Sequence, residues 1–524
     1  MQSAVKPDRM SAPVDFSVHA VQQSLKQAKR SRSSGPDGFP SMFWANLSSE
    51  LALPVSIIFS LSYSFAALPN DWRHALVVPL HKKGDPSQVS NYRPISLTST
   101  LCKVMETMIN KNLQRYSSAH SIIDSNQHGF FPGRSTCTQL LESQYKWCAA
   151  LDNNVVSDVI LIDFSKAFDV VPHSKLINKL ASLGVCHPTL RWITAFLSNR
   201  SQSVVLNDVF SSPSAVTSGV IQGSVLGPTL FALYVSDLPT ACPDCSIGQY
   251  ADDTKASRQI TKPHDRVMLQ GSLNALCSWA EQHELALSLD KCLYLQVGYS
   301  DSTITYTVGS RSLKPSQSVT DLGIVVQSNL KPGLHCTQVA TKANARARLI
   351  LKSFLSRDAS CLTRAFITYV RPLLEYATPV WSPHFKQDVD LIEGVQRVFT
   401  RKLFYICNLP PATYDERLRL LGLQRLELRR LHYDVCLMFK LTHGIINCHL
   451  RHAISLAPRA GLRGHRYKLH VLPAKKLVLS SHFIHRTVPV WNSLPDSCFV
   501  PDSYSVFKRK IVNINLCKYL VGKA

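Results

Sequence analysis

The sequence predicts a mixed α+β fold in which a small sheet lies among many helices. Residues 155–162 are apolar and rich in β-branched side chains, a pattern typical of a buried strand. Residues 246–249 predict a second strand, which ends in a polar turn like the tip of a hairpin. Helix-like segments dominate from residue 331 to residue 443. The chain therefore joins a region that contains a sheet to a region that is mostly helical.

Acidic residues follow both of these strands. Asp163 comes directly after the first, and Asp252 and Asp253 close the tetrapeptide Tyr250-Ala251-Asp252-Asp253 after the second. Such carboxylates suit Mg²⁺, which prefers carboxylate, phosphate and water oxygens. Two such ions together lower the pKa of an attacking hydroxyl and neutralise charge on a triphosphate. Taken singly, each motif is equally well explained by an N-cap aspartate or by a solvated acidic turn.

A glycine-rich stretch separates the two acidic motifs. Residues 218–228 contain three glycines and the amide side chain of Gln222, ahead of an apolar, helix-like segment at residues 230–235. Glycines there would let the backbone approach a ligand closely, and the simpler interpretation is a tight loop. The order of acidic strand, Gly-Gln-Gly loop and Tyr-Ala-Asp-Asp resembles motifs A, B and C of reverse transcriptases. More narrowly, it is similar to the polymerases of non-LTR retrotransposons of the jockey and chicken-repeat type.

The resemblance covers nearly the whole chain. Upstream blocks match the fingers side of this family, and downstream blocks match its motif D, the approach to its thumb and a late tryptophan motif. The matching blocks are Ser34–Gly38, Val77–Pro86, Asn91–Ser96, Gln127–Phe130, Leu287–Cys292, Asp321–Gly323, Tyr369–Tyr376 and Trp491–Pro495. The resemblance implies a right-hand polymerase with fingers, a palm that holds a small antiparallel sheet, and a helical thumb.

Pattern and resemblance together divide the chain into four parts. Residues 1–70 are expected to form a helical N-terminal extension, and residues 71–300 the reverse transcriptase fingers and palm. Residues 301–443 would form the connection and the helical thumb, and residues 444–524 a basic C-terminal extension. Two basic pairs at i,i+4 spacing in the thumb suit a grip on a duplex across its minor groove: Lys342 with Arg346, and Arg348 with Lys352.

The resemblance also implies roles for single residues. Asp163, Asp252 and Asp253 would bind two Mg²⁺ ions, for which Mn²⁺ could substitute, and the backbone carbonyl of Phe164 would be a further ligand. Phe168 matches the bulky residue that lies under the sugar and excludes a 2′-hydroxyl by steric clash. An ordinary core aromatic is the alternative interpretation of Phe168.

Further residues would contact the substrates. Gln222 and Gly223 would lie along the incoming nucleotide and the template, and Tyr250 and Ala251 complete this set. Three cations would clamp the triphosphate electrostatically, unless they are solvated surface charges: Lys82, Lys83 and Arg93.

Two departures from the family pattern stand out. Lys291 would lie where such enzymes place a general acid for pyrophosphate, but Asp290 stands before it where the family commonly has asparagine. Full-length elements of this kind carry an endonuclease domain ahead of the polymerase, and the sequence has no room for one. The expectation is therefore a truncated copy or a fragment, with the nuclease supplied elsewhere if the element is mobile.

The composition favours a nucleic-acid partner. The chain has 58 Lys+Arg against 35 Asp+Glu, a net charge of +23 and a pI near 9.5, as expected of a protein that binds phosphates. Residues 451–476 contain basic side chains and no acid, which favours contact with RNA or the primer duplex, or else a solvated tail. A second basic cluster, mixed with acids, is interpreted as a solvated helix face: Arg417, Arg419, Arg425, Arg429 and Arg430.

Length and cysteine usage indicate a multidomain protein with reduced thiols. A chain of 524 residues with 45% hydrophobic residues can form two to four domains with a large core. Fifteen cysteines without regular spacing predict reduced thiols in the nucleus or cytoplasm. Cys242 and Cys245 lack a second pair of zinc ligands and are interpreted as structural. The uncharged stretch Leu51–Leu68 is interpreted as a half-buried amphipathic helix, so no membrane is expected as a partner.

These features predict an RNA-directed DNA polymerase that extends a primer 3′-hydroxyl with dNTPs by two-metal catalysis. Its partners would be an RNA template and a DNA primer or an RNA–DNA hybrid; in an intact element the primer would be nicked chromosomal DNA. A viral RNA-dependent RNA polymerase more often has a polar or acidic residue where Phe168 stands, and a group II intron maturase has a splicing domain without a visible counterpart here. A catalytically inactive RNA-binding relic of a retroelement is the alternative from another class.

Overall fold

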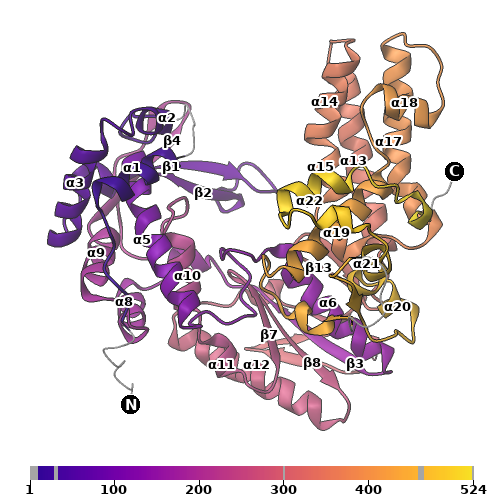
Figure 1. The fold of residues 1–524 in the computed structure, drawn as a ribbon. Coiled ribbons are helices and arrows are strands. Elements are labelled where there is room, and N and C mark those ends of the chain that lie inside the picture. The colour runs from indigo at the N-terminus through magenta and orange to yellow at the C-terminus, as the bar shows by residue number, and fades with distance from the viewer. Residues whose placement is uncertain (1–9, 29–33, 299–300, 302, 458–464, 522–524) are drawn as a thin grey trace. The chain divides into compact units, whose positions relative to one another are not determined.

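The computed structural model describes residues 10–28, 34–298, 301, 303–457 and 465–521, which form two compact units (Figure 1). The first unit contains the residues up to Phe131, Ile162–Thr254 and Gly271–Lys291; the second contains Pro132–Leu161, Lys255–Gln270 and the residues from Cys292 on. The predicted mixture of helices and sheets is confirmed. Because the chain passes between the units several times, the four contiguous parts expected from the sequence are not these units, and that division by function stays a prediction.

Five strands of the first unit form one sheet. Strands β1 (His74–His81) and β2 (Tyr92–Leu97) are antiparallel neighbours, and β4 (Arg200–Leu206) lies parallel to β1 on its other side. The short strands β5 (Val209–Phe210) and β6 (Ser214–Val216) both pair antiparallel with β4. The sheet therefore joins residues near position 80 to residues near position 205.

Helices account for most of the remaining first unit. Local sequence explains where several begin: the hydroxyl of Ser99 caps the helix that starts at Thr100, and Pro188 occupies the first turn of the helix that starts at His187. The helices are α1 (Val18–Lys26), α2 (Ser41–Asn46), α3 (Ala52–Phe65), α4 (Asn70–Arg73), α5 (Thr100–Ala119), α7 (Ala167–Val170), α8 (His173–Ser182), α9 (His187–Leu197), α10 (Gly227–Tyr234) and α11 (Leu238–Ala241), and most of α12 (His264–Gln282) also belongs here.

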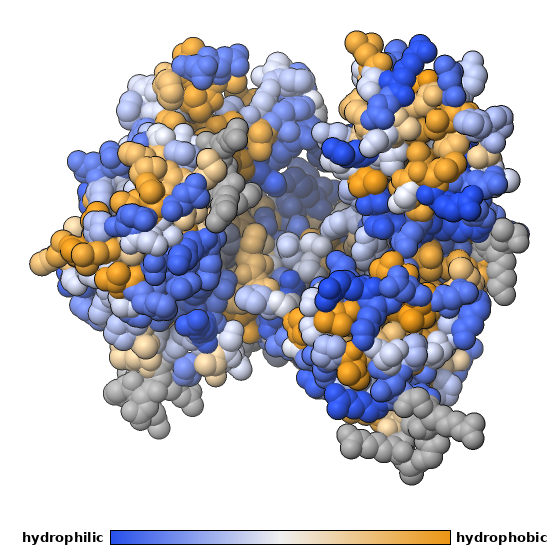
Figure 2. Space-filling view, turned by 45° about the horizontal axis from the view of Figure 1, so that its top comes forward, coloured by the Kyte–Doolittle hydropathy of each residue, from blue (hydrophilic) through white to orange (hydrophobic). Residues whose placement is uncertain are grey.

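Helix α3 is half-buried, as the sequence predicts. The hydroxyl of Ser56 lies on its inner face and donates a hydrogen bond to the carbonyl of Phe16 at 2.6 Å. Its outer face is nevertheless apolar, and hydrophobic surface gathers at the left edge of Figure 2, where α3 lies. The exposed apolar residues recur at helical spacing: Leu53, Ile57, Leu61 and Phe65. In the described part of the chain, no helix is long and apolar enough to cross a membrane.

The second unit contains the predicted buried strand at residues 155–162. This strand, β3 (Val156–Ile162), pairs antiparallel with β9 (Leu293–Val297), with Val159 opposite Leu295. Strand β12 (Pro315–Ser316) lies parallel to β9 on its far side, and β8 (Asp253–Ile260) is the other neighbour of β3. Trp147 and Val326 pack with these strands in a small apolar core.

Smaller hairpins and a large set of helices complete the second unit. The predicted helical character of residues 331–443 is confirmed, and these helices share one extensive core with the C-terminal segment. The helices are α6 (Thr136–Asp152), α13 (Gly333–Ser353), α14 (Ala359–Tyr369), α15 (Arg371–Glu375), α16 (Thr378–Trp381), α17 (Lys386–Ile406), α18 (Tyr414–Leu420), α19 (Leu426–Thr442), α20 (Leu477–Ser480), α21 (Phe483–Asn492) and α22 (Tyr504–Ile511). The hairpins pair β10 (Tyr306–Val308) with β11 (Arg311–Leu313), β13 (Ser318–Asp321) with β14 (Ile324–Gln327), and β15 (Ser455–Leu456) with β16 (Leu469–His470).

The interpretation of the basic cluster around α18 and α19 as a solvated helix face is wrong for most of its members. Arg430 is only 2% exposed, because α19 packs against α17 and α21. Arg417 is also buried and donates a hydrogen bond to the carbonyl of Ala412 at 2.6 Å. Of the five arginines, only Arg419 is exposed. The other two form ion pairs within the fold: Arg425 with Asp415, and Arg429 with Glu375.

A buried carboxylate on β3 ties several elements of the second unit together. Asp158 is completely buried and accepts hydrogen bonds from the hydroxyls of Tyr294 at 2.9 Å and Tyr306 at 2.7 Å. The amide of Gln296 donates at 3.3 Å, and Arg266 lies 3.4 Å from the same carboxylate. Since these donors come from β9, β10 and α12, Asp158 fixes three elements to the strand that precedes Asp163.

We expect Asp158→Leu to lower the free energy of unfolding by about 3–5 kcal/mol, since it leaves the Arg266 charge and two buried hydroxyls without an acceptor. Urea unfolding followed by circular dichroism would measure the change. Tyr306→Phe removes a single donor and should cost only about 1 kcal/mol. An equal decrease in the free energy of unfolding in the two variants would contradict the interpretation that all these donors depend on the Asp158 carboxylate.

Candidate active site

Asp163 follows β3 directly, as predicted, and its surroundings belong to the first unit. Its carboxylate accepts a hydrogen bond from the Lys291 ammonium, with Nζ 2.8 Å from Oδ2. The backbone around it is held as well: the Asp163 carbonyl accepts from the Ser288 amide at 2.8 Å, and the Ser165 amide donates to Ala286 at 2.7 Å. The segment that leads to Lys291 is thus bound along the segment that carries Asp163.

The second acidic motif forms the predicted hairpin tip. Strand β7 (Ser246–Tyr250) ends at Tyr250 and β8 begins at Asp253, so Ala251 and Asp252 make the turn. Ala251 has a φ of 58°, in the left-handed region that residues with a Cβ rarely adopt. The turn therefore has an unusual backbone at the residue next to the two carboxylates.

The electrostatics show that the two motifs come together. Burial raises the pKa of the Asp252 carboxyl above its ordinary value, and the negative charge of Asp163 raises it further. The positive charges of Arg93 and Lys291 act in the opposite direction. Two acids and two cations that were far apart in the sequence are therefore within electrostatic reach of one another.

The donor chemistry of this site fits a divalent cation. Asp163 and Asp252 repel each other, and both offer the hard oxygen ligands that Mg²⁺ prefers. Asp253 is exposed at the start of β8. Among the residues that the structure describes, no group of three or more His, Cys, Asp or Glu side chains is already arranged around one metal position. Asp163 thus acts electrostatically on Asp252, and the metal set stays a prediction.

Phe168 lies beside the site in an aromatic cluster. Its ring stacks on that of Phe231 with centroids 4.4 Å apart and an interplanar angle of 17°. Phe130 meets it edge-on at 6.2 Å, and the same Phe130 ring lies 6.3 Å from that of Tyr250. Phe130 is 45% exposed, and no role for its side chain was predicted from the sequence. Phe168 is partly buried, and its role under the sugar stays a prediction.

The glycine-rich loop packs tightly against the protein itself. The close neighbours of Gly219 and Gly223 are backbone atoms, as the interpretation of a tight loop predicts, and an approach to a ligand stays a prediction. A Cβ on Gly219 would lie 2.5 Å from the Asp169 carbonyl oxygen, and one on Gly223 would lie 2.3 Å from that of Ser96. Gln222 is fixed too, since its amide donates to the Asp169 carboxylate at 2.8 Å.

The other predicted site residues are placed as follows. Lys82 is close enough to Asp169 to lower the pKa of a carboxyl that burial raises, and Lys83 is exposed beyond the end of β1. The ring of Phe164 is buried 6.5 Å from that of Trp279. The sulfur of Cys242 donates to the Ser272 carbonyl at 3.4 Å, which is a structural contact.

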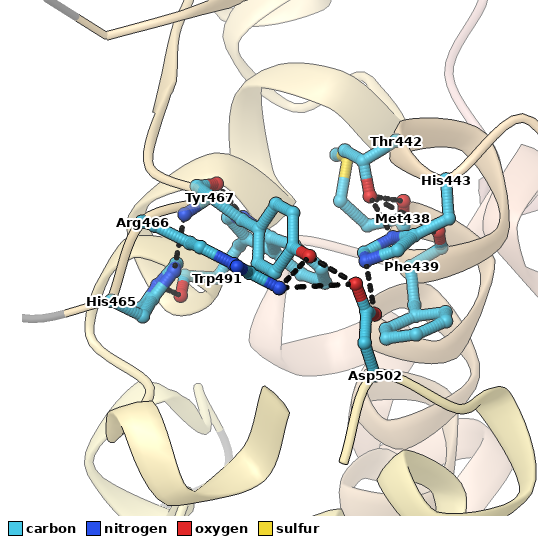
Figure 3. Close-up of polar contacts among 9 residues, drawn as sticks. All are labelled: Met438, Phe439, Thr442, His443, His465, Arg466, Tyr467, Trp491 and Asp502. Carbon is cyan, nitrogen blue, oxygen red and sulfur yellow. Dashed lines mark hydrogen bonds and ion pairs between the residues drawn. The ribbon is translucent and has the colours of Figure 1, made fainter. Parts of the chain in front are cut away.

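The described residues of the basic run 451–476 belong to the folded second unit and do not form a solvated tail; residues 458–464 lie outside the described part. Arg466, Tyr467 and His443 converge on the Asp502 carboxylate (Figure 3). The ring of His465 is hydrogen-bonded to the Trp491 carbonyl at 3.0 Å. These residues therefore hold the C-terminal segment against α19 and α21.

Comparison with known proteins finds one family model and several relatives that match this chain. Residues 80–326 match the family model described as "Reverse transcriptase (RNA-dependent DNA polymerase)". The chain is 26% identical to the "Probable RNA-directed DNA polymerase from transposon BS" and 27% identical to the "RNA-directed DNA polymerase from mobile element jockey", both of Drosophila melanogaster. Each match covers 76% of this chain and 45% of the relative. The chain thus spans less than half the length of these relatives.

We expect Gly223→Ala to lower the free energy of unfolding by about 2–3 kcal/mol, because the added methyl meets the Ser96 carbonyl and the backbone is left-handed. Gly271→Ala is the matched control: nothing lies within 4 Å of the new methyl in the middle of α12. That control should stabilise the fold by about 1 kcal/mol. A neutral Gly223→Ala variant in thermal unfolding would contradict the packing of the loop on β2.

Proposed function

We propose that the chain is an RNA-directed DNA polymerase, because residues 80–326 match the reverse transcriptase family model and the chain is similar to the RNA-directed DNA polymerases of transposon BS and mobile element jockey. It would extend a primer 3′-hydroxyl with dNTPs on an RNA template, as a step of retrotransposition. The observation that carries the proposal is the meeting of Asp163 and Asp252 at the ends of two strands, with Lys291 and Arg93 close by.

The carboxylates would form the centre of the reaction. Asp163, Asp252 and Asp253 would hold two divalent cations, Mg²⁺ or Mn²⁺, with the Phe164 carbonyl as a further ligand. Once bound, the ions would lower the pKa of the primer hydroxyl and neutralise charge on the triphosphate. Lys291, which donates to Asp163 here, would turn to the leaving pyrophosphate and supply a proton.

Neighbouring side chains would bind and select the nucleotide. Arg93 and Lys82, each within electrostatic reach of a site carboxylate, would contact the triphosphate together with Lys83. Gln222, oriented by Asp169, and Gly223 would line the nucleotide and template beside Tyr250 and Ala251. The partly buried ring of Phe168 would lie under the sugar and leave no room for a 2′-hydroxyl.

The template and primer would be held by the basic surface of α13. Lys342, Arg346, Arg348 and Lys352 are all exposed on this helix. Exposed cations at i,i+4 spacing repel one another in an isolated helix, and phosphates of a duplex would relieve that repulsion. We therefore assign residues 301–443 to connection and thumb, residues 71–300 to fingers and palm, and any cut in chromosomal DNA to a nuclease supplied elsewhere.

Primer extension on poly(rA)/oligo(dT) with Mg²⁺ tests the activity. The double variant Asp252→Asn, Asp253→Asn should incorporate dTTP about 10³-fold more slowly or not at all, as when essential catalytic groups are removed. Asp208→Asn, which alters an exposed acid in the turn between β4 and β5, is the matched control and should extend normally. Folded wild-type protein that binds the duplex and extends nothing with Mg²⁺ or Mn²⁺ would favour the inactive RNA-binding relic.

Selection against ribonucleotides gives a separate prediction. Phe168→Val should raise the use of UTP relative to dTTP by about 10²-fold, because it removes the bulk proposed to lie under the sugar. Phe231→Leu disturbs the same ring stack from the other side and serves as the control. The measurement is the ratio of kcat/KM for dTTP to that for UTP in each variant. If both variants lower this ratio equally, Phe168 affects selection through packing alone.

A further inference from the structure

The amide of Gln127 binds the backbone of the acidic turn on both sides of one residue. Its Oε1 accepts hydrogen bonds from the amides of Ala251 at 2.9 Å and Gly129 at 2.8 Å, and its Nε2 donates to the Ala251 carbonyl at 3.4 Å. The Gln127 side chain is 2% exposed. A buried glutamine thus satisfies both the N–H and the C=O of the residue that precedes the two carboxylates.

The turn at Ala251 has a backbone conformation that these hydrogen bonds stabilise. Ala251 is buried at 4% exposure and has a φ of 58°, where its Cβ crowds the following carbonyl. Without partners, its buried N–H and C=O groups would also be left unsatisfied. The conformation of Ala251 sets the direction in which Asp252 and Asp253 leave the strand. Loss of the amide would therefore free the backbone at the point where the carboxylates are aimed.

Gln127 is itself held in place by the chain around it. The amide of His128 donates to the Gln249 carbonyl, and the amide of Gln249 donates to the Asn126 carbonyl, both at 2.9 Å. The segment approaches so closely that a Cβ on Gly129 would lie 2.4 Å from the Ala251 nitrogen. The glutamine therefore reaches the turn from a segment that is hydrogen-bonded to β7.

We propose that Gln127 is a positioning residue that fixes the Asp252 and Asp253 carboxylates for metal binding by clamping Ala251. The inference rests on the proposed function, since it assumes that these carboxylates hold the divalent cations. Only a side chain that offers an acceptor and a donor at this distance satisfies both backbone groups. Methionine preserves the length and apolar bulk of the chain and removes both hydrogen-bonding groups, whereas glutamate keeps the acceptors and loses the donor.

Direct Mn²⁺ binding to the full chain, followed by electron paramagnetic resonance, tests the proposal without requiring activity. Gln127→Met should weaken Mn²⁺ binding about 10-fold or more, the range found when a residue that orients metal ligands is removed. Asp252→Asn identifies the part of the signal that belongs to this turn. Gln396→Met is the matched control: Gln396 is fully buried in α17 and donates to Tyr414 and Gln424 at 3.0 Å each, so it loses a comparable amide without touching the turn.

Primer extension at varied Mg²⁺ adds a second readout. Gln127→Met should need about 10-fold more Mg²⁺ for its half-maximal rate and should recover rate at high metal, while Gln396→Met keeps the wild-type curve. An unchanged Mn²⁺ affinity in Gln127→Met, or an equal loss in Gln396→Met, would overturn the inference. If Gln127→Met does not fold, Gln127→Glu is judged by the same criteria. A wild-type protein that extends nothing would refute the proposed function, and Mn²⁺ affinity would still decide the role of Gln127.

Discussion

The repulsion between the Asp163 and Asp252 carboxylates is the constraint on which the rest of the site depends. These two acids are brought together in surroundings that raise the pKa of Asp252, so the fold must hold them against both desolvation and like charge. It does so through the backbone on either side. Ser288 and Ala286 bind the segment around Asp163, and Gln127 binds the turn before Asp252. The repulsion that remains at neutral pH is what a divalent cation would remove.

The second constraint is that the strands which lead to these acids must not shift. Asp158, buried on β3 ahead of Asp163, is the acceptor for donors from β9, β10 and α12. A shift of one residue in the register of β3 would move the Asp158 carboxylate to the opposite face of the sheet, away from its donors. The same shift would displace Asp163. The glycine loop is fixed by packing, since Gly223 lies against the Ser96 carbonyl and leaves no space for a larger residue. The segments that stabilise the fold here, β3 and the glycine loop, are therefore also the segments that position the site residues.

Local pattern explains which features could be predicted from the sequence. The apolar, β-branched run of β3, the hairpin tip at Ala251 and the helices after Lys331 follow from spacing within a few residues, and the structure confirms them. What the sequence could not supply is the partner across the fold. Arg430 stands among basic and acidic residues in the sequence, a pattern typical of a solvated helix face. It is nevertheless buried, because α19 packs against α17 and α21. Gln127 belongs to a recognisable block, yet only the three-dimensional contact with Ala251 reveals what its amide does.

The backbone of the acidic turn bears on the choice between an enzyme and an inactive relic. A left-handed alanine costs of order 1–3 kcal/mol, and a partly buried carboxylate beside a like charge also lowers stability; neither contributes to the apolar core. A protein that only binds RNA would gain from a relaxed turn and from fewer acids at this place, since phosphates repel carboxylates. Arg93 and Lys291 offset the repulsion only in part, because the pKa of Asp252 stays raised beside them. The left-handed Ala251, with Gln127 bound to it, is the arrangement that a site requires if it must aim two carboxylates at one place.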